Sequence, residues 1–297
     1  MESIVLAGAT GFVGGEIARQ AQERGIRFTA VVRSHDTAIE FATNGIDTIV
    51  ADIAKGVVPY ASAGAVETVI NAVGIIREEG EATFDAVHYF GVKNLLAAFP
   101  NAGRFIQVSA LGTRPNAPTL YHRTKQMAED AITGSGKTYT ILRPSIVFGP
   151  GDKFVNMLAE LVKKAPFIPV VGTGANKMQP VYVGDVAQMA LDALTLDAAA
   201  NQIVEVAGSE VVTLEGILDF LAEHFSLKKP KVHIPLSVLS MTAATLGKWT
   251  TSFPVTTEQV QMLKDDNVCD IERMKAIFGI EPKPFKDTVR TYLVGRV

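Results

Sequence analysis

Glycine recurs at every third position near the start of the chain, within the segment GATGFVGG at residues 8–15. Gly8, Gly11 and Gly14 follow the apolar run SIVLA and precede the helical segment GEIARQAQERG. A glycine-rich turn between a strand and a helix lets the backbone approach a pyrophosphate and directs the helix N-terminus at its negative charge. The spacing and position of these glycines therefore predict a dinucleotide-binding loop, with an unliganded turn as the alternative.

Strands and helices alternate through the first half of the chain, as in a doubly wound parallel α/β sheet, the Rossmann fold. Short β-branched runs predict strands at residues 3–7, 27–32, 47–51, 67–73, 104–110, 139–144 and 202–208, with helical patterns between most of them. Proline and glycine become frequent after Gly149. We therefore expect a dinucleotide-binding domain from residues 1–149 plus 181–207, and a smaller C-terminal substrate or partner domain from residues 150–180 plus 208–297.

The composition excludes several classes of function. Hydrophobic residues make up 47% of the chain, charged residues make up 20%, and the formal net charge of -3 gives no basic field for nucleic acid. The single cysteine, Cys269, excludes a disulfide framework and a cysteine-rich zinc site. The five histidines lack the spacing of metal ligands, so we predict no catalytic metal.

No run of eighteen apolar residues and no signal-peptide pattern occurs, so we expect a cytoplasmic protein. The apolar stretch at residues 234–249 is predicted to be a helix buried in the smaller domain or in a dimer contact. Its alternative is an interfacial helix that makes the protein peripheral to a membrane.

The glycine spacing, with Thr10 inside the loop, resembles that of the short-chain dehydrogenase/reductase superfamily in its extended and atypical branches. The resemblance covers the whole chain. The segments RFIQVSALGT and YHRTKQMAE, and the order GPGDKF, IPVVGTG, QPVYVGDVA, are similar to atypical members around the NADPH-binding accessory subunit of respiratory complex I and its bacterial relatives.

This resemblance implies a catalytic group of Ser109, Tyr121 and Lys125. In the family, the tyrosine and lysine lie at i and i+4 on one helix face. The lysine binds the cofactor ribose, and its charge lowers the pKa of the tyrosine. The tyrosine passes a proton while hydride moves to or from the nicotinamide, and the serine orients the substrate oxygen.

Arg33 and Ser34 follow the second strand, where an acidic residue would bind the ribose 2′-hydroxyl of NAD(H). An arginine there accommodates a 2′-phosphate, so we predict NADP(H) over NAD(H). The alternative is a solvated Arg33, with Asp36 or nothing binding the ribose. The remaining cofactor-binding positions implied by the resemblance are Gly8, Thr10, Gly11, Phe12, Val13, Gly14, Asp52, Ile53, Asn71, Ala72, Val73, Gly74, Lys125, Pro144 and Ile146.

The leading hypothesis is an NADP(H)-dependent oxidoreductase that acts on a small or quinone-like carbonyl compound. One alternative is a non-catalytic nucleotide-binding subunit or sensor, associated with a membrane or a respiratory complex. Another is a nucleotide-sugar epimerase or dehydratase, which His88 and Ser145 disfavour because they stand where those enzymes carry asparagine. The resemblance also implies a homodimer through two of the helices.

Overall fold

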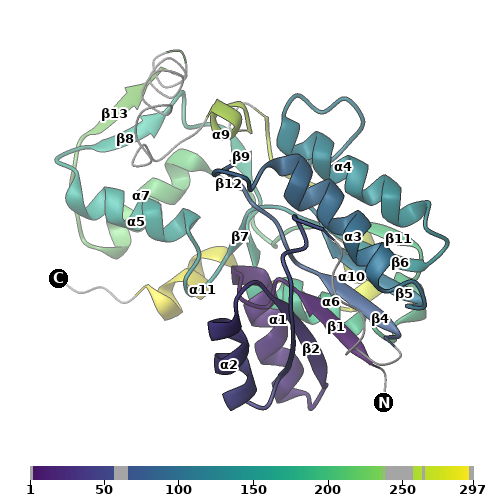
Figure 1. Cartoon of the computed structure of the whole chain (residues 1–297). Helices are drawn as coiled ribbons and strands as arrows, with labels where there is room; N and C mark the ends of the chain where they lie inside the picture. The colour runs from purple at the N-terminus through teal and green to yellow at the C-terminus, as the bar shows by residue number, and fades with distance from the viewer. Residues whose placement is uncertain (1–2, 57–65, 236, 238–256, 263–264, 294–297) are drawn as a thin grey trace. The chain divides into compact units, whose positions relative to one another are not determined.

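The computed structural model describes residues 3–56, 66–235, 237, 257–262 and 265–293, and Figure 1 shows its elements. The chain divides into two compact units. The first comprises Met1–Pro144, Val183–Val206 and Glu272–Ile280, and the second comprises Ser145–Tyr182, Ala207–Ile271 and Glu281–Val297. The assignment of one unit to the cofactor and the other to a substrate or partner stays a prediction.

The first unit contains a seven-stranded sheet in the order β11-β6-β5-β4-β1-β2-β3, with every neighbouring pair parallel. Its strands are β1 (Ile4–Ala7), β2 (Phe28–Val32), β3 (Asp47–Val50), β4 (Thr68–Asn71), β5 (Arg104–Val108), β6 (Thr138–Pro144) and β11 (Gln202–Val206). The predicted doubly wound parallel sheet is confirmed. Strand order reverses between β1 and β4, and ligands of such sheets bind beyond the carboxyl ends at that point.

Helices cover this sheet, and α2 and α4 begin at a side-chain cap. They are α1 (Phe12–Glu23), α2 (His35–Thr43), the π-helix η1 (Asp85–Phe90), α3 (Gly91–Ala98), α4 (Leu120–Thr133), α6 (Val183–Asp192), the 3₁₀ turn η2 (Asp197–Ala199) and α10 (Glu272–Phe278). Ser34 and Thr119 cap α2 and α4 because each side chain accepts a hydrogen bond from a backbone N–H of the first turn. Helix α1 packs against α6, and α4 packs against both η1 and α3.

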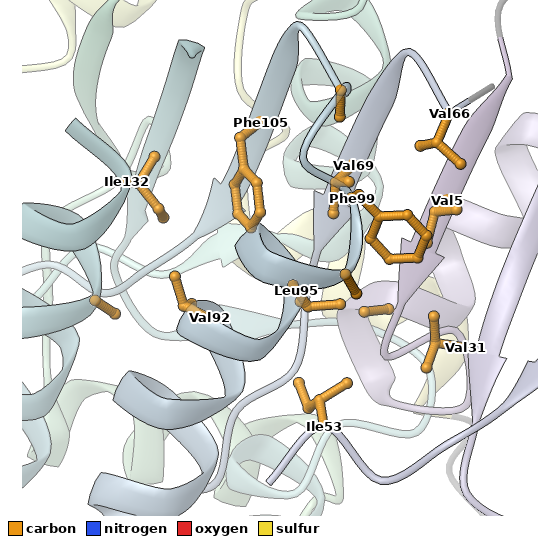
Figure 2. Packing of buried hydrophobic residues seen from close by; sticks show 14 of the residues in the cluster. Val5, Val31, Ile53, Val66, Val69, Val92, Leu95, Phe99, Phe105 and Ile132 are labelled. Carbon is orange, nitrogen blue, oxygen red and sulfur yellow. The ribbon is translucent and has the colours of Figure 1, made fainter. Parts of the chain in front are cut away.

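The largest buried side chains of the sheet core on the α3 side are Phe99, directly after α3, and Phe105 of β5 (Figure 2). Val92 and Leu95 of α3 are fully buried, and Figure 2 shows them on the same side of the sheet as Val5, Val69 and Phe105. Strands β1 and β4 are buried at every position, as expected for parallel strands covered on both faces. This packing fixes the carboxyl ends of the central strands, which carry most of the predicted site residues.

The second unit has a separate core around Phe148, Phe220 and Phe285, with ring centroids 4.9 Å apart for Phe148 and Phe285. Its elements are β7 (Val147–Phe148), α5 (Phe154–Lys164), β8 (Ile168–Val171), β9 (Lys177–Met178), β10 (Val181–Tyr182), β12 (Val212–Thr213), α7 (Leu214–His224), β13 (Lys231–Ile234), α9 (Thr257–Met262) and α11 (Phe285–Tyr292). The predicted apolar helix at residues 234–249 lies, beyond its first residues, outside the described residues. Among those described, no helix has the length and hydropathy needed to cross a bilayer.

Lys137 closes the loop after α3 by donating from Nζ to three backbone carbonyls. The acceptors are Phe99 O at 3.1 Å, Pro100 O at 2.8 Å and Ala102 O at 2.6 Å. A cation at a helix C-terminus satisfies the last carbonyls and interacts favourably with the helix dipole. We expect Lys137→Met to lower the free energy of unfolding by about 1–2 kcal/mol.

Urea denaturation measures this loss, and exposed Lys93 on α3 supplies the control. Lys93→Met is expected to stay within about 0.5 kcal/mol of the unsubstituted protein. Equal losses in both variants would show that the three carbonyl contacts contribute nothing specific.

Candidate functional site

The glycine loop connects β1 to α1 in a conformation that side chains would obstruct. Gly8 has a φ of +91°, and a Cβ there would lie 2.8 Å from the carbonyl carbon of Ala72. A Cβ on Gly14 would lie 2.0 Å from the carbonyl oxygen of Gly8. The first glycine is therefore needed for the turn beside β4, and the third for close packing of α1 on the end of β1.

The N-terminus of α1 follows the exposed residues Thr10 and Gly11. Gly11 is the N-cap in an extended conformation, and no side chain caps this helix. Phe12 and Val13, in the first turn, are partly exposed. Because the first N–H groups of a helix have no acceptor within it, this end offers donors and a positive dipole to an anion. The loop thus fits the pyrophosphate of a dinucleotide.

Arg33 and Ser34 are exposed at the carboxyl end of β2, immediately before α2. The Ser34 hydroxyl accepts from the Thr37 N–H at 3.2 Å and lies 2.9 Å from the Thr37 hydroxyl. Asp36, in the first turn of α2, is also exposed. This end of β2 therefore carries one exposed cation, Arg33, and one exposed anion, Asp36, beside the N-terminus of α2.

The two segments after β3 and β4 are shaped by their own polar side chains. Asp52 accepts from the Ala54 N–H at 3.1 Å, and Ile53 is buried in the sheet core. Asn71 is buried, donates to Gln107 Oε1 at 2.9 Å and accepts from the Val73 N–H at 3.0 Å. The Asn71 amide therefore fixes the loop Ala72–Gly74, leaving Gly74 itself exposed.

The Lys125 side chain, from the middle of α4, lies beside this loop. The Lys125 side chain is buried, and its Nζ donates to Val108 O at 3.3 Å. A Cβ on Gly74 would lie only 3.0 Å from the same Nζ. Gly8 contacts Ala72 and Val73 of that loop, so one short loop links the glycine turn to the Lys125 ammonium.

Tyr121 precedes Lys125 by one helical turn on α4 and lies among aromatic rings. Its ring meets Phe84, His88 and His122 edge-on, at centroid distances of 5.8, 5.3 and 5.0 Å. Ser109 follows β5 and is buried. Its hydroxyl donates to Glu129 Oε1 at 2.5 Å, a partner that the sequence did not indicate.

Burial shifts both titratable groups of the predicted catalytic set. Desolvation raises the pKa of Tyr121 to about 12, opposite to the lowering expected from a neighbouring lysine. That expectation is wrong for the chain by itself, because the loss of solvation outweighs any effect of the ammonium. Desolvation also lowers the pKa of Lys125 to about 8, against a smaller raising effect from Glu129.

His88 is a buried residue of the π-helix η1 that sequence reasoning considered only as a departure from a family pattern. Its Nδ1 lies 3.0 Å from Thr124 Oγ1, and its Nε2 lies 3.2 Å from both the backbone nitrogen and the carbonyl oxygen of Ile75. Thr124 Oγ1 donates to Tyr121 O, which favours Nδ1–H as the donor to Thr124 and Nε2 as the acceptor from Ile75. Burial, and secondarily the Lys125 charge, lower the pKa of His88 to about 2.

The last two predicted cofactor positions fall in different units. Pro144 ends β6 in the first unit, and its carbonyl accepts from the Leu111 N–H at 2.8 Å. Ile146 belongs to the second unit. The described residues bring together no group of histidine, cysteine, aspartate and glutamate side chains that could bind a metal ion.

Comparison with known proteins gives a family match and several relatives. A family model described as NAD(P)H-binding matches residues 8–196. A complex I protein of Arabidopsis thaliana, NADH dehydrogenase [ubiquinone] 1 alpha subcomplex subunit 9, is 29% identical over 256 residues, which cover 80% of this chain and 61% of the relative. A ceramide reductase of Caulobacter vibrioides is 29% identical over 194 residues, which cover 62% of this chain and 58% of the relative.

These alignments span less than two thirds of either relative's length. Among solved structures, an NADPH-dependent quinone oxidoreductase of Escherichia coli in complex with NADPH aligns with a TM-score of 0.77 at 16% identity. The alignment covers 97% of this chain and 99% of that one. At such low identity the likeness shows the fold alone.

Proposed function

The chain belongs to the NAD(P)H-binding family, with the short-chain dehydrogenase/reductase fold, and from that premise we propose that it is an NADP(H)-dependent oxidoreductase. Its proposed substrate is a small or quinone-like carbonyl compound. The reductases among its relatives and the quinone oxidoreductase of similar fold support this reaction class. The proposed catalytic residues are Ser109, Tyr121 and Lys125.

The observation that carries the proposal is the contact between Lys125 and the loop beside the glycine turn. Gly8 packs on Ala72 and Val73, and Gly74 packs on the Lys125 ammonium. A dinucleotide whose pyrophosphate lies at the N-terminus of α1 would extend past this loop towards α4. This arrangement supports a role for Lys125 in binding the ribose next to the nicotinamide.

When bound, the nicotinamide supplies the hydride. Tyr121 is protonated at neutral pH because its pKa is about 12, so its hydroxyl is a proton donor to the reduced carbonyl oxygen. A protonated Lys125 would stabilise the negative charge that remains on the phenol oxygen after this transfer. Ser109 donates its proton to Glu129, so its remaining lone pairs would accept from a hydroxyl or N–H donor such as a protonated phenol, and they cannot bind the substrate carbonyl oxygen, which is itself an acceptor.

A coupled test of this proposal measures NADPH oxidation with a panel of quinones, aldehydes and ketones. Consumption of NADPH matched by formation of the reduced product would support an oxidoreductase. NADPH that binds without being consumed by any acceptor would favour the second candidate function, a nucleotide-stabilised subunit. The complex I relatives of the chain, including a 40 kDa subunit from Neurospora crassa, are the observation in its favour.

Arg33 gives a prediction about cofactor choice. We expect Arg33→Ala to raise the Kd of NADPH by about 10–100-fold, because one charge-assisted contact to the 2′-phosphate is lost. The Kd of NADH, which has no such phosphate, should stay unchanged. Isothermal titration calorimetry measures both constants.

Arg27 provides the matched control because it is an exposed arginine directly before the amino end of β2. Arg27→Ala should leave both dissociation constants at the values of the unsubstituted protein. Equal weakening of NADPH and NADH by Arg33→Ala would count against 2′-phosphate recognition by this residue.

A further inference from the structure

Glu129 is a buried carboxylate next to the proposed catalytic set, with no role in the reaction described so far. It lies on α4 at i+4 from Lys125 and is 1% exposed. Residues with this spacing are neighbours on one helix face. A carboxylate is rarely buried unless it is paired, so its partners indicate what it does.

The Glu129 carboxylate joins two strands of the sheet to α4. Its Oε1 accepts from the Ser109 hydroxyl at 2.5 Å and from Arg143 Nε at 3.0 Å. Its Oε2 accepts from Arg143 Nη2 at 2.5 Å. Ser109 follows β5 and Arg143 belongs to β6, so the carboxylate receives donors from both strand ends.

The hydrogen bond from Ser109 to Glu129 determines whether the Ser109 hydroxyl can donate or accept a further hydrogen bond. A hydroxyl has one proton to donate and two lone pairs that accept. The charged oxygen of Glu129 is a stronger acceptor than a neutral carbonyl, so it retains the Ser109 proton. Ser109 is thereby oriented as a hydrogen-bond acceptor.

The charge of Glu129 also reaches Lys125, whereas His88 on η1, which the Lys125 charge also affects, is uncharged near neutral pH because its pKa is about 2. Burial favours the neutral amine of Lys125, and the Glu129 carboxylate opposes this by favouring the ammonium. The Arg143 guanidinium neutralises part of the carboxylate charge, since its side chain forms the closest ion pair there. The attraction that remains favours the charged form of Lys125.

We propose that Glu129 is a positioning residue that keeps Lys125 protonated and holds Ser109 as a hydrogen-bond acceptor. This inference rests on the proposed function for its effect on turnover. The effect of Glu129 on the protonation of Lys125 does not depend on any catalytic activity.

The sign of the pH effect follows from the lysine equilibrium. The Lys125 ammonium is present below its pKa of about 8 and is lost as the pH rises through that value. Removing the Glu129 charge takes away a stabilising partner of the ammonium and lowers this pKa further. A drop of about one unit reduces the charged fraction at pH 8 about fivefold and changes little at pH 6.

The primary experiment follows the ¹³Cε resonance of Lys125 through a pH titration of the full chain without nucleotide, assigned by its absence from Lys125→Arg. The midpoint is expected near pH 8 in the unsubstituted protein. It should lie about one unit lower in Glu129→Gln. Glu129→Asp, which keeps the charge, should restore most of the difference.

Asp130→Asn is the matched control because Asp130 is an exposed carboxylate on the same helix. It should leave the Lys125 midpoint unchanged. An unchanged midpoint in folded Glu129→Gln would overturn the proposal. If that variant fails to fold, Glu129→Gln/Arg143→Gln removes both buried charges together, and a midpoint equal to that of the unsubstituted protein would overturn the proposal equally.

The secondary readout is the pH profile of kcat with the best acceptor found for the unsubstituted protein. Glu129→Gln should lower kcat about fivefold at pH 8, with recovery towards pH 6. A merely structural role would lower kcat by the same factor at every pH, and that result would contradict the proposal. If the unsubstituted protein reduces no acceptor, the proposed function fails, whereas the NMR titration still decides the role of Glu129.

Discussion

Tyr121→Phe is expected to lower kcat for NADPH-dependent reduction by about 10²–10⁴-fold, the range associated with loss of a general acid. The substitution removes only the hydroxyl, and its ring contacts with Phe84, His88 and His122 are retained. The fold and the Kd of NADPH should therefore be unchanged. Steady-state NADPH oxidation and calorimetry on the same preparation measure the two quantities.

Tyr89→Phe is the control for this prediction because Tyr89 belongs to η1 and contacts Phe90 and Lys93 instead. Its kcat should match that of the unsubstituted protein. If Tyr121→Phe reduces the same acceptor at the unsubstituted rate, the proton donor lies elsewhere. The proposed catalytic role of Tyr121 would then be wrong.

Gly14→Ala is expected to weaken NADPH binding by about 100-fold or more. A Cβ at this position would lie 2.0 Å from Gly8 O and 2.6 Å from the Gly8 carbonyl carbon, so α1 must move away from the loop. Displacing the helix N-terminus by about 1 Å is enough to cost two orders of magnitude in a positioned site. Overpacking should also destabilise the protein by about 1–3 kcal/mol.

Gly15→Ala separates this steric effect from the general effect of removing a helical glycine. A Cβ on Gly15 would lie 3.4 Å from Ala9 O, an ordinary contact. This neighbouring variant should bind NADPH normally, and its unfolding free energy should rise because alanine favours the helix by about 1 kcal/mol. Equal loss of binding in both variants would refute the packing argument.

The parallel sheet and the position of the glycine loop were predictable because both depend on local pattern. Buried parallel strands such as IVLA at β1 are continuous apolar runs, and the turn after them needs a left-handed residue at Gly8. The end of β2 at Val32 was predicted in the same way, whereas β4 ends at Asn71, two residues before the predicted end of that strand at residue 73. Arg33 and Ser34 were identified because they come directly after the last residue of β2.

The partners of the proposed catalytic residues were not predictable, because they come from distant parts of the chain. Ser109 follows β5, Glu129 lies on α4 and Arg143 lies on β6, and only the packing of α4 on the sheet brings them together. One signal was available in retrospect. Glu129 falls on the buried stripe of α4, between Ala128 and Ile132, where a solvated carboxylate would not lie.

The direction of the Tyr121 pKa shift was wrong for a related reason. The spacing of Tyr121 and Lys125 indicated a charge effect, but spacing contains no information about burial. The rings around Tyr121 come from Phe84 directly before η1, from η1 and from α4 itself, and desolvation dominates its pKa. A sequence motif therefore identifies the pair of groups without fixing their acidity.

The central claim is that the carboxyl edge of the sheet is an NADP(H) site, and calorimetric titration of the unsubstituted protein with NADPH and NADH tests it most directly. The account predicts that NADPH binds at least about tenfold more tightly, because the contact proposed between Arg33 and the 2′-phosphate is charge-assisted. Equal affinity, or tighter binding of NADH, would contradict it.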